Sequence, residues 1–147
     1  MNPTGAIHPL LKKLQYKPAV VVYALNHPPE FEATLNLMKA QVAVCTQWPQ
    51  EGDVSFVLHF VQSEKEIENT LDLLQGRLKG DIVLWFAFPK KSSKKYVVEI
   101  NRDQGWDSLI RSGLVPVRSV SIDENWTALR FRRVEYIKSM TRTFNPA

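Results

Sequence analysis

A basic loop is the feature of this sequence with the clearest chemistry. It follows an apolar stretch, Ile82 to Phe88, that we predict to be a strand. Ammonium and hydroxyl groups suit phosphate oxygens, and open α/β sheets collect ligands at the carboxyl ends of their strands. The loop combines both properties, since its residues are Lys90, Lys91, Ser92, Ser93, Lys94 and Lys95.

We therefore predict an anion-binding rim formed by this loop together with Arg102. The helix that carries Trp106 follows, and its N-terminal amides can add donors to the same anion. The alternative is a solvated lysine loop, because exposed lysines contribute little to stability and need no ligand.

A second cluster lies in the last predicted strand. Alternation along a strand puts Leu129 on one face, and Arg130 with Arg132 on the other. Trp126 precedes them, and Arg118 on the partner strand can join them. Guanidinium groups beside an indole can stack on bases or bind phosphates. The alternative is a half-buried edge strand whose charges prevent aggregation.

Other chemistries have little support in the sequence. His8, His27, His59 and Cys45 are scattered and share no metal-ligand spacing. Neither a nucleophile elbow nor a phosphate-cradling glycine loop occurs. We predict that His59 is a core histidine and Cys45 a small buried residue, and we place His27 at the ligand-binding rim. No catalytic residue, metal or cofactor is assigned, and catalysis is left open.

Apolar strands and amphipathic helices alternate along the chain. Continuous apolar runs of strand length are typical of strands buried on both faces, and they predict strands over 19–25, 41–46, 53–61 and 82–88. Two further strands, 115–122 and 127–135, are joined too closely for a parallel crossover and must be antiparallel. Helices are predicted from Leu10, from Pro28, from the capping box Ser63–Glu66 and around Trp106, the last capped by Asn101 or Asp103.

These elements predict one α/β domain over residues 1–147, with about 1–8 and 141–147 loose. Its fold is a Rossmann-like, mostly parallel sheet with helices on both faces and a C-terminal antiparallel hairpin. The residues expected to be buried in central strands are Val21, Leu25, Val57, Phe60, Leu84 and Phe86.

Charge is unevenly placed in a chain of otherwise ordinary composition. Residues 1–80 carry 7 basic and 8 acidic residues, whereas 81–147 carry 12 and 7, so the net charge of +4 belongs to the second half. Such asymmetry favours an anionic partner, although solubility explains it as well. The single cysteine, the lack of a secretory signal and the lack of a long apolar run favour a cytoplasmic protein without a membrane partner.

Three motifs resemble an uncharacterised bacterial family known only as a domain of unknown function. They are Pro-Lys-Lys-Ser-Ser-Lys-Lys at 89–95, Asn-Arg-Asp-Gln-Gly-Trp at 101–106, and Ile-Asp-Glu-Asn-Trp-Thr-Ala-Leu-Arg-Phe-Arg at 122–132. The resemblance extends over nearly the whole chain and implies a bacterial protein, but it brings no activity.

The order of the predicted elements is similar to a shortened class I S-adenosylmethionine-dependent methyltransferase. In that fold a glycine-rich turn after the first strand admits the cofactor, and an acid at the end of the second strand holds its ribose. Here the turn at 26–30 reads Asn-His-Pro-Pro-Glu and the strand end at 44–47 reads Val-Cys-Thr-Gln. Without that glycine and that acid, we expect S-adenosylmethionine to bind weakly or not at all.

Our leading hypothesis is a non-catalytic Rossmann-like domain that binds an anionic ligand through its basic rim. Candidate ligands are a nucleotide, a nucleic-acid backbone or an acidic protein. The alternative is a divergent methyltransferase-like enzyme, and a third hypothesis is a dimeric protein-interaction module. The three hypotheses differ in what the domain must bind, which is an anion, S-adenosylmethionine or a second protein chain.

Overall fold

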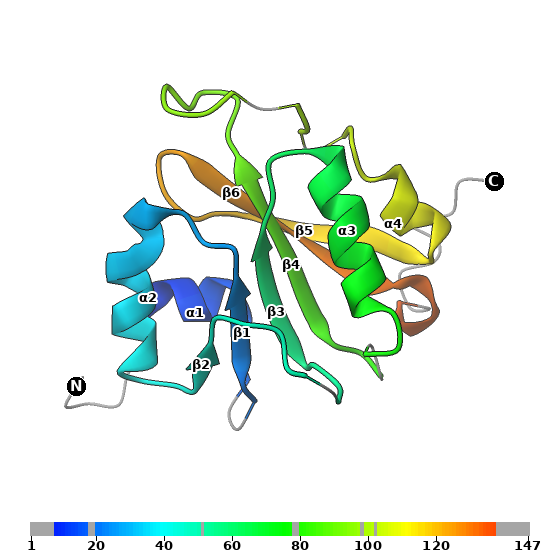
Figure 1. Ribbon diagram of the computed structural model, residues 1–147, viewed down its shortest axis with the longest axis horizontal. Coiled ribbons are helices and arrows are strands. Elements are labelled where there is room, and N and C mark those ends of the chain that lie inside the picture. Colours follow the sequence, from blue (N-terminus) through cyan, green and yellow to red (C-terminus); the bar gives the residue numbers. More distant parts are fainter. Residues whose placement is uncertain are drawn as a thin grey trace.

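Six strands form one sheet, and their arrangement confirms the predicted fold class. The computed structural model describes residues 8–17, 20–50, 52–77, 80–97, 99–101 and 103–137. The strand order is β2-β1-β3-β4-β6-β5 (Figure 1). The four parallel strands are β1 (Val22–Leu25), β2 (Val44–Cys45), β3 (Phe56–Phe60) and β4 (Val83–Pro89). The predicted hairpin consists of β5 (Leu114–Ser121) and β6 (Trp126–Arg133), and β6 also pairs antiparallel with β4.

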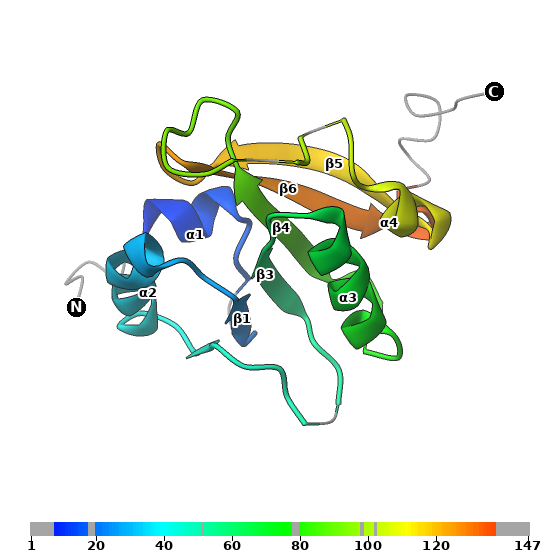
Figure 2. The ribbon, with the colours of Figure 1, turned by 45° about the horizontal axis from the view of Figure 1, so that its top comes forward.

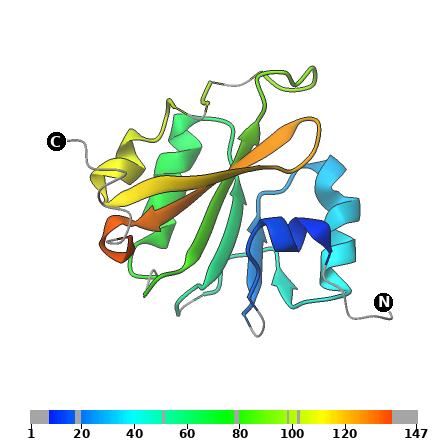
Figure 3. The same ribbon diagram turned by 180° about the vertical axis from the view of Figure 1, so that it is seen from behind.

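Helices lie on both faces of the sheet, as predicted. The rear face carries α1 (Pro9–Lys13) and α2 (Glu32–Lys39), the latter after a 3₁₀ turn η1 (Pro29–Phe31). The front face carries α3 (Glu64–Leu74) and α4 (Asp107–Arg111), and a second 3₁₀ turn η2 (Val134–Tyr136) follows β6. Figure 2 shows α3 and α4 on the front of the sheet, and Figure 3 shows α1 crossing its rear.

The central strands are buried on both faces. Every residue of β3 and β4 is buried, which is the pattern of parallel strands between two helical layers. Trp85 packs into the rear core and Phe86 into the front core. The predicted core residues that are buried are Leu25, Val57, Phe60, Leu84 and Phe86. Val21 is only half-buried, because it precedes β1.

The predicted N-terminal cap is correct for α3 and wrong for α4. At α3 the Ser63 hydroxyl accepts the Glu66 N–H at 3.2 Å, and the Glu66 carboxylate accepts the Gln62 N–H at 2.7 Å, which confirms the capping box. The cap predicted for α4 is wrong. Asn101 instead accepts the Asp103 N–H within its own turn, and α4 begins only after Trp106.

Two predictions about strand position are corrected. Cys45 is exposed, not buried, because β2 is a two-residue strand at the edge of the sheet. The last strand, β6, is not an edge strand, because β5 lies outside it. Protection of an edge therefore cannot explain the arginines of β6.

The strand order reverses between β1 and β3. The chain moves from β1 outward to β2, and then returns to build β3 and β4 on the other side of β1. Ligands of open α/β sheets bind outside the carboxyl ends of the strands at such a reversal. The upper rim of the sheet in Figure 1, where β1, β3 and β4 end, is thus the place to search for a site.

The predicted loose termini lie mostly outside the described residues, which leave out 1–7 and 138–147. His8 is described, and its ring accepts the Leu10 N–H at 3.0 Å as the cap of α1. Among the described residues no helix has the length and apolar character needed to cross a membrane.

Candidate anion-binding site

A groove of about 500 Å³ opens at the carboxyl end of β4. It is lined by the end of β4, by the first half of the basic loop (residues 90–95), by the hairpin and by the turn before α4. The lining residues are Phe88, Pro89, Lys90, Lys91, Ser92, Asn101, Asp103, Ser119 and Thr127. The structure thus brings three of the predicted site residues, Lys90, Lys91 and Ser92, to one concave surface.

Ser93 holds the basic loop in shape. Its hydroxyl donates to the Asn125 side chain at 2.9 Å and accepts the backbone N–H groups of Lys95 and Tyr96 at 3.2 and 3.1 Å. The Lys90 N–H also donates to the Asn125 carbonyl at 2.8 Å. Ser93 therefore orders the loop against the hairpin turn and leaves Lys91 and Ser92 at the exposed tip.

The polar groups of the groove differ in how far they are already engaged. The Lys90 ammonium donates to the Ser121 hydroxyl at 2.7 Å, and the Thr127 hydroxyl donates to the Val120 carbonyl at 2.9 Å. The side chains of Lys91, Ser92 and Ser119 have no hydrogen bond or ion pair with another described residue. With Asp103 as the one acidic residue lining it, the groove carries a net positive charge and free hydroxyls, which suit an anion.

Lys95 faces away from the groove and is already paired. Its ammonium lies 3.1 Å from the carboxylate of Glu30, which follows β1. The same carboxylate accepts the Tyr96 hydroxyl at 2.6 Å and the Trp126 indole N–H at 2.8 Å. Sequence reasoning missed Glu30. Its position directly after the predicted first strand, at the ligand-binding rim, was the available signal.

The pKa of Glu30 reflects this arrangement. Burial acts to raise it, but the hydrogen bonds from Tyr96, Trp126 and Lys95 outweigh burial and lower the pKa to about 2. Burial and the bond to this carboxylate in turn raise the pKa of Tyr96 to about 12. Glu30 is therefore ionised, and its carboxylate accepts hydrogen bonds from three side chains.

Trp126 does not form a stacking platform with the arginines of its strand. Its side chain is 1% exposed and packs between Phe60 and Tyr96, with ring centroids 5.1 and 5.0 Å away. Arg132 stands six residues further along β6, about 20 Å away at the usual rise of a strand. The Trp126 indole is therefore buried in the core and is not exposed beside these guanidinium groups.

The other predicted site residues lie outside the groove lining. Lys94 is exposed on the basic loop, and Arg102 lies outside the described residues. His27 does lie at the rim, but its Nε2 is 2.7 Å from the Glu32 carboxylate, which gives it a local partner. Arg130 and Arg132 face the rear of the sheet with Ala128, whereas the groove lies on the front with Phe88.

The crevice at the strand reversal is occupied by the protein itself. Asn26 has a φ of 62°, the left-handed conformation that glycine favours, and its amide donates to the Phe60 carbonyl at 2.9 Å. Behind it, the Phe31 and Phe60 rings stand 5.0 Å apart. At the strand reversal, an asparagine amide thus joins the end of β1 to the end of β3, with aromatic rings behind it.

His59 is a core residue, as predicted. It is 8% exposed in β3, donates from Nδ1 to the Phe60 carbonyl at 3.0 Å, and lies 3.2 Å from the Thr70 hydroxyl. Burial lowers the pKa of its imidazole to about 4. Within the described part of the chain, no group of three or more histidine, cysteine or acidic residues is placed to hold a metal ion.

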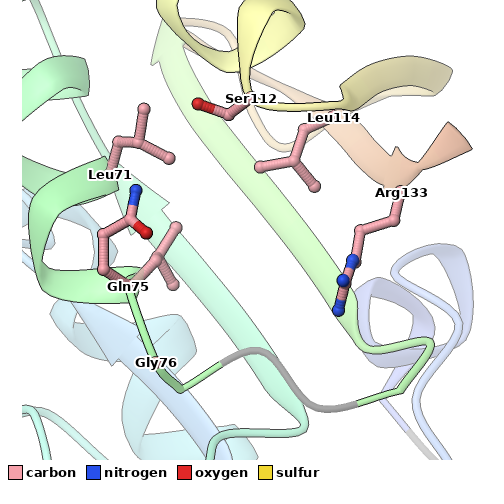
Figure 4. Close-up of a pocket in the computed structure, with 7 residues that line it drawn as sticks. Leu71, Gln75, Gly76, Ser112, Leu114 and Arg133 are labelled. Atoms are coloured by element: carbon pink, nitrogen blue, oxygen red, sulfur yellow. The ribbon is translucent and has the colours of Figure 1, made fainter.

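A second, smaller cavity of about 200 Å³ lies between α3 and the start of β5. Leu114 projects into it, while Gln75 and Arg133 stand on opposite sides (Figure 4). Arg133 also lies 3.3 Å from the Glu135 carboxylate. Because its polar groups do not converge, this cavity is a weaker candidate than the groove.

Solved structures of methyltransferases share the fold. A S-adenosylmethionine-dependent methyltransferase from Aquifex aeolicus is 16% identical with a TM-score of 0.54, and the match covers 85% of this chain and 88% of that one. A candidate type 11 methyltransferase from Sulfolobus solfataricus is 10% identical with a TM-score of 0.52, covering 85% and 89%. At such low identity the likeness shows the fold alone.

No protein-family model matches this chain, so its resemblance to an uncharacterised bacterial family stays a prediction. No curated protein sequence matches it either. What the solved structures confirm is the methyltransferase-like, Rossmann-type architecture that the order of the elements predicted.

Proposed function

We propose that this protein binds a nucleotide or a similar phosphate-bearing small molecule in the groove at the end of β4. The observation that carries the proposal is that Lys90, Lys91 and Ser92 line the same groove as Ser119. A phosphate there gains charge-assisted hydrogen bonds from ammonium groups and neutral ones from hydroxyls.

The size and the apolar part of the groove lining favour a nucleotide over a bare anion. A volume of about 500 Å³ falls in the range of small-molecule sites. Phe88 and Pro89 add apolar atoms to the lining, which suit a base or sugar beside a phosphate held by the lysines. Open α/β sheets also bind ligands at this end of their strands.

The test is isothermal titration of ATP, ADP, AMP and adenosine into the purified protein at low salt. We expect the nucleotides to bind and adenosine, which has no phosphate, to bind much more weakly. The Lys90→Ala/Lys91→Ala double variant should lose at least about tenfold in affinity, because two charge-assisted contacts disappear.

The matched control is Lys39→Ala/Arg111→Ala, which removes the same charge from exposed helix positions away from the groove. It should keep the wild-type affinity. Absence of nucleotide binding by the wild-type protein, or an equal loss in both double variants, would refute the proposal and leave a solvated lysine loop.

A second candidate function is that of a divergent methyltransferase, which the shared fold favours. The residues at the strand reversal do not fit S-adenosylmethionine. The turn after β1 has Asn26 and two prolines instead of glycines, the Asn26 amide bridges to Phe60, and the end of β2 offers no acid for a ribose. We therefore derive no methyl-transfer step.

A further inference from the structure

A cluster of cations lies on the rear of the sheet, on the opposite face from the groove. Arg130 and Arg132 project from β6 on the side of Ala128, and Arg118 of β5 stands opposite Arg130 in the strand register. Lys17 and Asp81 are close enough to act on the same group of charges. We call this the arginine cluster, and its members are Lys17, Asp81, Arg118, Arg130 and Arg132.

One ion pair neutralises only part of the cluster. The Arg132 guanidinium donates to both Asp81 oxygens, from Nε at 2.9 and 3.0 Å and from a terminal nitrogen at 2.5 Å. Hydrogen bonding to Arg132 lowers the pKa of Asp81 against the effect of burial. The charge of Asp81 also acts on Arg130 and Lys17, but one carboxylate stands against four cations, so the cluster keeps an excess of positive charge.

Arg130 is held in this position at a cost to stability. It is half-buried, one terminal nitrogen donates to the Gln15 side chain at 2.5 Å, and its Nε is buried without a hydrogen-bond partner among the described residues. Burial lowers the pKa of its guanidinium, the charges of Arg132 and Arg118 lower it further, and the charge of Asp81 acts to raise it. A half-buried cation with an unsatisfied donor and like-charged neighbours is destabilising unless something else compensates it.

Protection of a sheet edge does not account for this arrangement. It can explain Arg118, which is exposed on the edge strand β5. It cannot explain Arg130, which lies on the interior strand β6. Like charges directly opposite each other on neighbouring strands are themselves unfavourable, so the pairing of Arg118 with Arg130 adds to the cost.

The rear face beside these arginines is accessible. Figure 3 shows the described helices α1 and α2 toward the β1 side of the sheet, with no described helix over the rear of β5 and β6. Arg118 is exposed and has no ion pair with another described residue. Arg118 is therefore open to a ligand from the solvent, and the half-buried Arg130 lies beside it.

We propose that the arginine cluster is a second anion site, which binds a phosphate group between Arg118 and Arg130. Guanidinium groups offer parallel N–H donors that match phosphate oxygens, and a dianion there would offset the repulsion between the two cations. Since Trp126 is buried, the site has no indole on which a base could stack, and it recognises the phosphate without reading a base. This inference does not depend on the proposed function, because it concerns the other face of the sheet.

The experiment observes the arginine Nε–Hε signals directly, in ¹⁵N–¹H correlation spectra of the full-length chain labelled with ¹⁵N. Three probes are titrated at low salt, namely inorganic phosphate, AMP and a short single-stranded oligonucleotide. We expect the Arg118 and Arg130 signals to shift with a common dissociation constant for each probe. Equal response to all three identifies a site for single phosphates, whereas a response to the oligonucleotide alone identifies a site for a phosphodiester backbone, and both outcomes support the cluster.

Three variants make the result specific. Arg118→Gln, at an exposed position, should weaken the response of Arg130 by at least about tenfold. Arg111→Gln, which removes the same charge from the exposed end of α4, should leave it unchanged. Arg130→Lys keeps the charge but loses the planar fork, and it should weaken binding as well.

The proposal fails if the Arg118 and Arg130 signals stay unchanged with all three probes. It also fails if Arg111→Gln weakens binding as much as Arg118→Gln, since net charge alone would then explain the effect. The Lys90→Ala/Lys91→Ala variant separates the two sites. It should weaken nucleotide binding in the groove by at least about tenfold and leave the response of Arg130 intact, so either site can fail without the other.

Discussion

Acidification from pH 7 to pH 5 should lower the free energy of unfolding through one side chain, His59. Burial lowers the pKa of its imidazole from 6.5 to about 4, against the effect of its hydrogen bond to the Phe60 carbonyl. Between these two pH values the His59 imidazole is protonated in the unfolded chain but stays neutral in the folded chain. The stabilisation is therefore complete above pH 6.5 and is lost as the pH falls toward 4.

Linkage gives the size of the effect. A pKa difference of about 2.5 corresponds to about 3 kcal/mol once the pH lies below both values. At pH 5 about 2 kcal/mol of this is lost relative to pH 7. No discount for solvent screening is needed, since His59 is only 8% exposed. The loss is a large part of the roughly 5–15 kcal/mol that stabilises a typical domain.

Urea unfolding, followed by tryptophan fluorescence at both pH values, measures this loss. His59→Gln carries no titrating ring at position 59, so its free energy of unfolding should fall by about 2 kcal/mol less than that of the wild type. His27→Gln, at the rim, is the matched control and should keep the wild-type decrease. Parallel decreases in the wild type and His59→Gln would refute the assignment of the effect to His59.

Three further predictions concern other sites. S-adenosylmethionine should give no measurable heat in isothermal titration, and a micromolar dissociation constant would show that the bridged crevice opens. Arg130→Met should keep or raise the free energy of unfolding, by up to about 2 kcal/mol, because it removes a half-buried, incompletely bonded guanidinium; a marked loss in urea denaturation would contradict this. Hydrogen bonds lower the Glu30 pKa to about 2 despite burial, so the wild type should lose stability as the pH falls from 4.5 toward 2. Glu30→Gln should lack this part of the stability already at pH 6. Thermal melting from pH 6 to pH 2.5 tests it, and identical profiles for variant and wild type would argue against it.

The fold was accessible from the sequence because burial on two faces leaves a continuous apolar signature. β3 and β4 are such runs, and every residue in them is buried. The capping box at Ser63 marked the start of α3 for an equally local reason. The predictions that failed concern positions whose burial depends on how the strands pair. Cys45 lies in an apolar stretch, yet only two residues there pair with β1, so its side chain is exposed at the edge.

Only part of the candidate site could be predicted. Charged residues are visible in a stretch of sequence, whereas the residues that pair with them lie far away along the chain. The basic loop is evident from its four lysines. That Lys95 is already paired depends on Glu30, which lies 65 residues earlier in the chain. The buried Trp126 indole donates a hydrogen bond to the same carboxylate, which lies 96 residues earlier in the chain. No periodicity in a single sequence encodes partners at such separations.

Glu30 also determines from which side an anion can approach the basic loop. Its carboxylate occupies the donors of Lys95, Tyr96 and Trp126. With a pKa of about 2 it is ionised at any physiological pH, so it repels a second anion from that side of the loop. On the other side, Lys91 meets no carboxylate partner among the described residues and borders the groove. If the protein binds a phosphate as proposed, we therefore expect it in the groove and not on the Glu30 side of the basic loop.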